Sequence, residues 1–233
     1  MWTHNEKFQR FAGGGWLEQT YLNTVSRVQF LFLGAHKDRE TVRLIKKARK
    51  KRKSLMSAYE MWIVYAYARA QSHFPGAMAE VGVYQGVSAK LMCECKGDKE
   101  IHLFDTFEGL PENHEHDRNV HRVGQYATSV ESVKAFLEDY ENVHFHQGLF
   151  PDSAAGLEEK PYCFVHLDVD LYESTLAGLE YFYPKMVPGG VILSHDYSIL
   201  AGVKKAFTEF MADKPEGLVE MPSTQCAFTK LGG

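Results

Sequence analysis

Apolar positions change their spacing repeatedly along the C-terminal two thirds of the chain. Short runs rich in Val, Ile and Phe are typical of strands, and stretches with apolar positions three and four apart are typical of helices. This pattern predicts strands at 77–83, 101–107, 142–148, 162–170 and 189–197, and helices at 87–95, 129–140, 173–186 and 202–213. Because strands and helices alternate, we expect a parallel sheet with helices on both faces.

The end of the chain departs from this alternation. Two short strand-like segments, GLVEMP and QCAFTKL, are separated by Ser223 and Thr224 alone. So short a connection joins antiparallel neighbours, since a parallel pair needs a long crossover. The sequence therefore predicts an α/β fold with a Rossmann-like sheet, mostly parallel with an antiparallel last strand. That is the pattern of class I methyltransferases rather than of nicotinamide dehydrogenases.

The first 75 residues carry a different pattern, which Pro75-Gly76 ends. Apolar positions with helical spacing are Leu55, Tyr59, Trp62, Ile63 and Ala66. We expect residues 1–75 to form a helical extension that closes the ligand pocket as a lid, and residues 76–233 to form the ligand-binding domain. The apolar stretch Thr24–Gly34 is a candidate interface for a homo-oligomer.

Composition places the chain among ordinary globular proteins. The apolar share is 45% and the charged share 24%, and no run approaches the roughly 18 apolar residues of a membrane span. The start, MWTHNEKFQRF, lacks the apolar core of a signal peptide. Four cysteines include a C-x-C pair, Cys93 and Cys95, whose spacing fits neither a zinc knuckle nor a disulfide framework. We therefore expect a cytoplasmic protein.

The charge distribution is uneven. The run KKARKKRK, Lys46–Lys53, has seven positive charges in eight residues, so a net charge of −4 for the chain leaves about −11 for the remainder. Such a run can contact an anionic surface, or it can be a solvated helix face. A specific nucleic-acid partner is not expected, because no aromatic-plus-basic signature or known module accompanies the run.

A glycine turn follows the first predicted strand, in AEVGVYQGVSAKLM, residues 79–92. The middle glycine of the dinucleotide fingerprint G-x-G-x-x-G is missing, which disfavours a pyrophosphate ligand. S-adenosylmethionine has no phosphate and fits better, although a turn without a ligand can look the same. Glu80 would lie near its cationic part, and Gly82 and Gly86 would leave room for it. Ser88 would bond its carboxylate together with free backbone N–H groups.

An acidic residue ends the second predicted strand. Asp105, in LFDTFEGLP, lies 23 residues after Gly82, close to the spacing at which a carboxylate meets a ribose diol. A cap of the following turn is the alternative. Thr106 beside it is a further candidate cofactor contact. Gly148, in QGLF after the third strand, is expected near the adenine from its position alone.

Four ionisable residues follow the fourth and fifth strands, in HLDVDLYES and LSHDY: Asp168, Asp170, His195 and Asp196. Close together they are unfavourable unless a cation or proton compensates them. Asp168 and Asp196 are candidate ligands of Mg²⁺ or another divalent metal, with His195 as third ligand or as a hydrogen-bonded neighbour. Asp170 is the candidate base for an acceptor hydroxyl, and His195 is the base in a metal-free version. Helix capping by the acids is the alternative.

Together these motifs resemble the macrocin O-methyltransferase family, whose TylF-like members methylate hydroxyls of sugars or phenols in natural products. The resemblance covers roughly residues 54–213 and rests on AEVGVYQGVSA, LFDTFEGLP, GLFPDS, LDVDLYESTLAGLEYFYPKMVPGGVILSHDY and GVKKAF. It implies S-adenosylmethionine as cofactor and Mg²⁺ in many members. In D-x-D-x-Y-E-S it implies Asp168 as metal ligand and Asp170 as base.

One position departs from the family pattern. Well-studied members resemble I-x-D-D-Y at the end of the fifth strand, where this chain has SHDY. His195 thus stands in place of the first aspartate, while Asp196 keeps the second. This weakens the case for Mg²⁺ and leaves Mn²⁺, another metal or none as alternatives.

A histidine-rich loop, ENHEHDRNVHR, Glu112–Arg122, lies between the second strand and the next helix. We expect a mobile lid over the substrate there. Ligation of zinc by His114, His116 and His121 is the alternative.

The motifs together predict an S-adenosylmethionine-dependent O-methyltransferase acting on a hydroxyl of a sugar, polyol or natural product. One alternative keeps the fold but acts on an amine without a metal. The other is a non-catalytic protein that contacts anionic surfaces through residues 46–53 and keeps a relic cofactor pocket.

Overall fold

The computed structural model describes residues 16–118 and 120–232, and it contains a seven-stranded sheet of order β3-β2-β1-β4-β5-β7-β6. Its strands are β1 (Ala77–Val81), β2 (Ile101–Asp105), β3 (Val143–Gln147), β4 (Tyr162–Leu167), β5 (Met186–Ser194), β6 (Val219–Glu220) and β7 (Cys226–Thr229). β1 to β5 pair in parallel, and β7 is antiparallel to both β5 and β6. The predicted mostly parallel sheet with an antiparallel last strand is confirmed.

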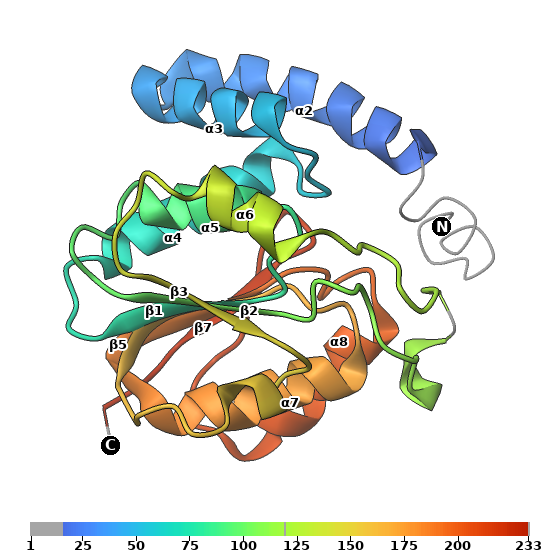
Figure 1. The fold of residues 1–233 in the computed structure, drawn as a ribbon, viewed down its shortest axis with the longest axis vertical. Coiled ribbons are helices and arrows are strands. Elements are labelled where there is room, and N and C mark those ends of the chain that lie inside the picture. Colours follow the sequence, from blue (N-terminus) through green and yellow to red (C-terminus); the bar gives the residue numbers. More distant parts are fainter. Residues whose placement is uncertain (1–15, 119, 233) are drawn as a thin grey trace.

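Helices cover both faces of the sheet. They are α2 (Trp16–His36), α3 (Arg39–Lys51), α4 (Ala58–Gln71), α5 (Val87–Cys93), α6 (Val130–Phe136), α7 (Tyr172–Phe182) and α8 (Ala201–Phe210), with 3-10 turns η2 (Glu115–Asp117), η3 (Asp152–Ala154), η4 (Tyr183–Lys185) and η5 (Met211–Asp213). α4, α5 and α6 lie on one face and α7 and α8 on the other (Figure 1). No helix within the described ranges has the length and apolar character needed to cross a membrane.

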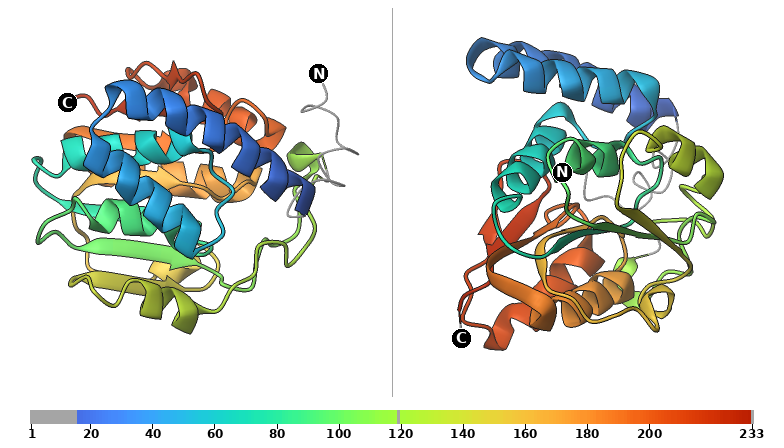
Figure 2. Two further views of the ribbon diagram at one scale, coloured as in Figure 1. Left: turned by 90° about the horizontal axis from the view of Figure 1, so that it is seen from above. Right: turned by 60° about the vertical axis from the view of Figure 1, so that its left-hand side comes forward.

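The N-terminal helices form an additional layer. α2 and α3 lie side by side over α4 and α5, as the view from above in Figure 2 shows. Within the segment proposed as an interface, Leu31 and Phe32 are exposed while Leu33 is buried. Residues 1–15 of the predicted extension lie outside the described part of the chain, and the homo-oligomer stays a prediction.

Two apolar cores lie on opposite sides of the sheet, as expected for a sheet covered by helices. The core beneath α4 and α5 includes Met61, Val64, Met78, Leu91 and Phe164. The core beneath α7 and α8 includes Val81, Phe104, Leu179, Phe182 and Phe207. Together they fix the strands whose carboxyl ends carry the candidate site.

Helix α4 is apolar on more than one side. The apolar positions with helical spacing include Tyr59, Trp62 and Ile63, which are half-buried, whereas Met61 and Val64 are fully buried. The helix lies between the sheet and the outer layer, where Trp62 packs against residues of α2 and α3. A helix covered on two sides is apolar around most of its circumference, so periodicity did not identify the face toward the sheet.

Two arginines of the basic run Lys46–Lys53 form hydrogen bonds with other helices. Arg49 Nη2 donates to Asn23 Oδ1 at 2.9 Å, and Arg52 Nη2 donates to the carbonyl oxygen of Ser132 at 2.7 Å. These bonds tie the end of α3 to α2 and α6. Exposed members of the run are Lys46, Lys47, Lys50 and Lys51. Contact with an anionic surface stays a prediction.

Candidate active site

A cavity of about 690 Å³ lies at the carboxyl ends of the parallel strands. It falls where the strand order reverses, because the sheet continues from β1 to β2 on one side and to β4 on the other. Open α/β sheets bind ligands at this switch point, and the volume is typical of small-molecule sites. The predicted site residues that line it are Gly82, Ser88, Asp105, Thr106, Gly148, Asp168, Asp170, His195 and Asp196.

Glu80 is not among the lining residues, contrary to the position expected for it beside the ligand. Its side chain is fully buried, and its Oε1 lies 2.8 Å from Nδ1 of His166, which is also fully buried. Burial raises the pKa of Glu80, and His166 opposes that shift. Successive side chains of a strand point to opposite faces, so Val81 reaches the cavity while Glu80 points into the interior.

The two glycines of the turn act through the backbone. Gly82 follows β1 and has a φ of 87°, and Gly86 caps α5 with a φ of 77°. A Cβ atom on Gly82 would lie 1.8 Å from the carbonyl oxygen of Asp168, and one on Gly86 would lie 2.9 Å from Val133. Gly86 does not line the cavity, so its requirement comes from helix capping and packing rather than from room for a ligand.

Asp105 holds the turn from inside. Its Oδ2 accepts hydrogen bonds from the backbone N–H groups of Val83 at 2.7 Å and Tyr84 at 2.8 Å, and its Oδ1 accepts from Phe107 at 2.6 Å. Burial raises the pKa of Asp105, and the three backbone donors oppose this shift. The turn cap that the sequence left as an alternative is therefore present. Since a carboxylate has about four acceptor positions, one remains for a ligand hydroxyl.

Asp168, His195 and Asp196 converge at the other end of the site. His195 Nδ1 lies 3.2 Å from Asp168 Oδ1 and 2.9 Å from Asp196 Oδ2. The His195 backbone N–H donates to the carbonyl oxygen of Leu167 at 2.9 Å, so the pairing of β4 with β5 continues past their ends. Each of the three side chains can offer one ligand atom, and these atoms lie within 4.8 Å of one another.

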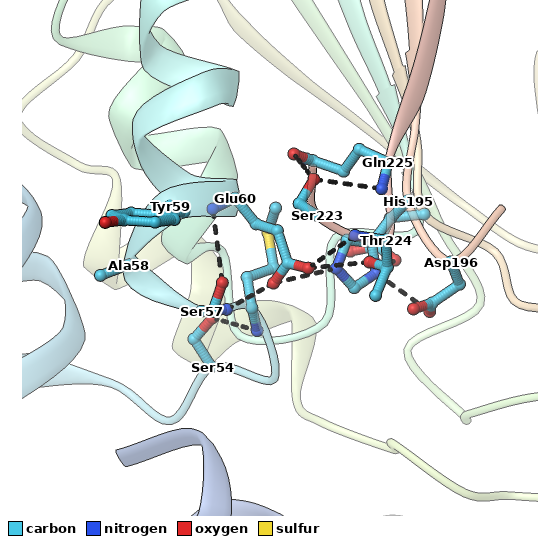
Figure 3. Close-up of polar contacts among 12 residues, drawn as sticks. Ser54, Ser57, Ala58, Tyr59, Glu60, His195, Asp196, Ser223, Thr224 and Gln225 are labelled. Atoms are coloured by element: carbon cyan, nitrogen blue, oxygen red, sulfur yellow. Dashed lines mark hydrogen bonds and ion pairs between the residues drawn. The ribbon is translucent and has the colours of Figure 1, made fainter. Parts of the chain in front are cut away.

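Glu60 of α4 is a further carboxylate at this cluster, which the sequence reasoning missed. Its Oε2 lies 3.5 Å from His195 Nε2, and its Oε1 accepts from the Thr224 hydroxyl at 2.8 Å (Figure 3). Oε2 also accepts from the Ser57 backbone N–H at 2.6 Å, which forms half of a capping box. The motif Ser-x-x-Glu is visible in the sequence as a helix start. Only the fold shows that the same carboxylate faces His195.

A comparison with known families identifies the family of the chain. The profile of the macrocin O-methyltransferase (TylF) family matches residues 64–224. The chain belongs to this family. The fold and the cavity at the switch point agree with that membership.

Two curated relatives and one solved structure extend the comparison. The chain is 35% identical over 141 residues to 8-demethyl-8-(2,3-dimethoxy-alpha-L-rhamnosyl)-tetracenomycin-C 4'-O-methyltransferase of Streptomyces olivaceus, covering 54% of each chain. It is 30% identical over 157 residues to demethyldecarbamoylnovobiocin O-methyltransferase of Streptomyces niveus, covering 60% of each. The chain thus spans little more than half the length of these relatives. The structure of the O-methyltransferase NovP has a TM-score of 0.70 at 22% identity, covering 92% of this chain and 100% of that one, and shows the same fold.

The charge of His195 and the charges of the surrounding carboxylates shift one another's pKa values. Burial by itself lowers the pKa of His195, but Asp196, Asp168 and Glu60 raise it well above its usual value. Burial raises the pKa of Glu60, but His195 and the hydrogen bonds from Ser57 and Thr224 together lower it. Burial and the neighbouring Asp196 carboxylate raise the pKa of Asp170 well above its usual value. A bound cation would oppose the shifts of His195 and Asp170, because it favours their deprotonated forms.

The donor set of this TylF site fits a divalent metal. Adjacent ligands bound at about 2.1 Å in octahedral geometry lie about 3.0 Å apart, and the two separations from His195 Nδ1 are 2.9 and 3.2 Å. His195 is 7% exposed, and neither ring nitrogen has a hydrogen bond of good geometry within the described chain. Two carboxylate oxygens and one imidazole nitrogen are therefore available to an ion.

Aromatic side chains form another wall of the cavity. Tyr84 and Tyr126 meet edge to face with ring centroids 5.8 Å apart, and His121 lies 6.1 Å from Tyr126. His121 is buried, its two ring nitrogens have no hydrogen-bond partner among residues 16–118 and 120–232, and burial lowers its pKa. A neutral imidazole is thus available to a polar group of the acceptor. Sequence reasoning considered His121 only for zinc or a lid.

The rest of the histidine-rich loop lies elsewhere. His114 and His116 pack around the ring of Tyr172, at centroid distances of 5.1 and 4.7 Å, and do not line the cavity. Buried Asp117 fixes this segment, because its carboxylate accepts from the backbone N–H groups of His114 and Tyr172, each at 2.7 Å. The structure therefore separates His121 from the other two histidines, so a zinc site using all three does not form.

Proposed function

We propose that this protein is an S-adenosylmethionine-dependent O-methyltransferase acting on a hydroxyl of a sugar or other natural-product acceptor. The observation that carries the proposal is one cavity at the switch point, lined by both the glycine turn and the acidic cluster. Membership of the TylF family supports methyl transfer. The names of the two curated relatives support a small-molecule hydroxyl as acceptor.

The donor would lie on the β1–β2 side of the cavity. Asp105 would accept from one of its ribose hydroxyls, and Ser88, near the start of α5, would bond its carboxylate. Thr106 and Gly148 also line this part of the cavity. Glu80 would support the site from behind, because its buried pair with His166 fixes the end of β1 against β4.

The acceptor hydroxyl would lie at the ends of β4 and β5. The oxygen forms a bond to the methyl carbon as the carbon–sulfur bond breaks, and the hydroxyl proton passes to the Asp170 carboxylate. The products are a methyl ether, S-adenosylhomocysteine and protonated Asp170. A divalent metal held by Asp168, His195 and Asp196 would lower the pKa of the hydroxyl. A cation held there would also favour the deprotonated form of Asp170, which is the form that accepts the proton.

Calorimetric titration with S-adenosylhomocysteine tests the donor site. We expect the wild type to bind it and Asp105→Asn to bind it about 10- to 100-fold more weakly, because hydrogen bonds to a charged group are worth about 1.5–3 kcal/mol. Asp139→Asn changes an exposed residue outside the cavity and serves as the matched control. No binding by the wild type, or equal binding by the Asp105 variant, would contradict the proposal.

A further inference from the structure

The candidate metal site of Asp168, His195 and Asp196 has one nitrogen donor, which an all-oxygen site lacks. The resemblance noted from the sequence implies an aspartate at the position of His195. The structure places His195 Nδ1 between the two remaining carboxylates, 3.2 Å from Asp168 Oδ1 and 2.9 Å from Asp196 Oδ2. Histidine is therefore part of the donor set by geometry as well as by sequence position.

We propose that this cluster selects a late first-row transition metal, such as Co²⁺ or Zn²⁺, over Mg²⁺, and that Glu60 is the positioning residue for His195. The inference deepens the proposed function and rests on it for the use of the ion in methyl transfer. Mg²⁺ prefers six oxygen ligands, whereas imidazole suits the later transition metals. An O,O,N donor set thus changes which ion binds without changing where it binds.

The ring nitrogens of His195 are buried without a well-aligned hydrogen bond to any described residue. The side chain is 7% exposed, so water does not solvate it freely, and neither nitrogen has a hydrogen bond of good geometry in the described chain. Nearly all buried polar groups have a partner. A metal ion bound to Nδ1 would supply that partner at the point where the Asp168 and Asp196 oxygens already converge.

Glu60 faces the His195 ring from the side opposite the two aspartates. Its Oε2 lies 3.5 Å from Nε2, the nitrogen that faces away from the two aspartates. Metal-bound histidines usually direct their second nitrogen to a carboxylate, which fixes the ring orientation and the tautomer. The Ser57 backbone N–H and the Thr224 hydroxyl hold Glu60 in place at 2.6 and 2.8 Å. Figure 3 shows these contacts meeting at the start of α4.

Visible absorption of Co²⁺, titrated into the metal-free full-length protein without donor, measures the site independently of activity. We expect wild-type protein to bind Co²⁺ through a nitrogen-containing site and to keep it against a large excess of Mg²⁺. In His195→Asp, which makes the donor set all-oxygen, we expect Mg²⁺ to displace Co²⁺ readily. Equal competition by Mg²⁺ in both proteins would overturn the proposed selectivity.

A pair of variants separates positioning by Glu60 from its structural role. Glu60→Gln keeps the side-chain size but removes the charge that faces Nε2, so we expect Co²⁺ affinity to fall about 10- to 100-fold. Ser57→Ala weakens the same capping box and leaves the Glu60–His195 contact in place, so its Co²⁺ affinity should match the wild type. Equal affinities in the two variants would overturn the role of Glu60.

Two other clusters in the described chain could also hold ions: Glu100 with His102 and His144, and His114 with Glu115 and His116. His144→Ala and His116→Ala should therefore keep the Co²⁺ spectrum, and its loss in either would place the ion elsewhere and overturn the proposal. Absence of any bound divalent ion would also overturn it, leaving protonated His195 to balance the carboxylates. Binding of S-adenosylhomocysteine, measured separately, would then still support the methyltransferase.

Discussion

Asp170 and Asp196 have left-handed backbone conformations, with φ values of 60° and 59°. Such conformations cost about 1–3 kcal/mol in residues other than glycine and concentrate at functional sites. Both residues follow the last hydrogen-bonded residues of a strand, so the turn redirects their carboxylates toward the cavity. Burial there and the nearby Asp196 carboxylate raise the pKa of Asp170.

Replacement of one carboxylate oxygen of Asp170 by an amide nitrogen tests its role as base. Asn tolerates a positive φ well, so Asp170→Asn should keep the turn while removing the proton acceptor. We expect kcat to fall about 10²- to 10⁴-fold, with unchanged affinity for S-adenosylhomocysteine. Product formation from a panel of sugar and phenol acceptors, followed by mass spectrometry, measures the first quantity, and calorimetry measures the second. A parallel loss of cofactor binding would indicate a structural role instead.

The antiparallel edge of the sheet is held by one buried carboxylate, that of Glu216. Its Oε1 accepts from Lys230 Nζ at 3.0 Å and from the Leu231 backbone N–H at 3.1 Å, and its Oε2 accepts from the Tyr183 hydroxyl at 2.8 Å. These bonds join the segment before β6, the end of β7 and η4. Burial raises the pKa of Glu216, but Lys230 and the other donors lower it to about 2.

This lowered pKa predicts a pH-dependent contribution to stability. Folding stabilises ionised Glu216, so its contribution is complete above the unfolded pKa of about 4.3. It is lost as the pH falls through the folded pKa of about 2. We expect Glu216→Gln to lower the free energy of unfolding by about 1–3 kcal/mol at pH 7, with a smaller difference at pH 3. Urea unfolding at several pH values measures this, with exposed Glu220→Gln as control. A pH-independent difference would contradict the ionic role.

At the scale of the whole molecule, the cavity joins segments from both ends of the described chain. Leu17, Tyr21 and Leu22 of α2 line it together with His195 and Thr224 from the C-terminal part. α2 lies in the outer layer, away from the strands of the sheet (Figure 1). The helix thus contributes an apolar cover to a site whose chemistry comes from the sheet, as expected for an element that excludes water.

Truncation of one side chain on α2 tests this cover. Leu22→Ala should raise the KM of the acceptor about 5- to 30-fold, because loss of about 1–2 kcal/mol of apolar contact weakens binding by that factor. Leu31→Ala on the same helix is the matched control, since Leu31 is 75% exposed and does not line the cavity. Steady-state kinetics measure both variants. Equal KM values would show that α2 does not contact the acceptor.

The spacing of apolar residues along the chain predicted much of this architecture. Alternation of strand and helix patterns predicted the parallel sheet, and the two-residue connection predicted its antiparallel end. It also placed Asp105, Asp168 and Asp196 near one cavity, because the carboxyl ends of parallel strands share one edge of a sheet. Element ends were less well predicted: the segments 173–186 and 202–213 each divide into an α-helix and a 3-10 turn.

Contacts between distant segments were decided only by the tertiary structure. Glu80 appeared to belong to the ligand, yet strand alternation turns it toward His166 in the interior. The sequence reasoning did not single out Glu60, and the packing of α4 against the sheet places it beside His195, which is 135 positions away in the chain. Spacing along the chain fixes which residues share a face of one element. Which faces meet depends on how the elements pack, and here that packing determines the charge and donor set around His195.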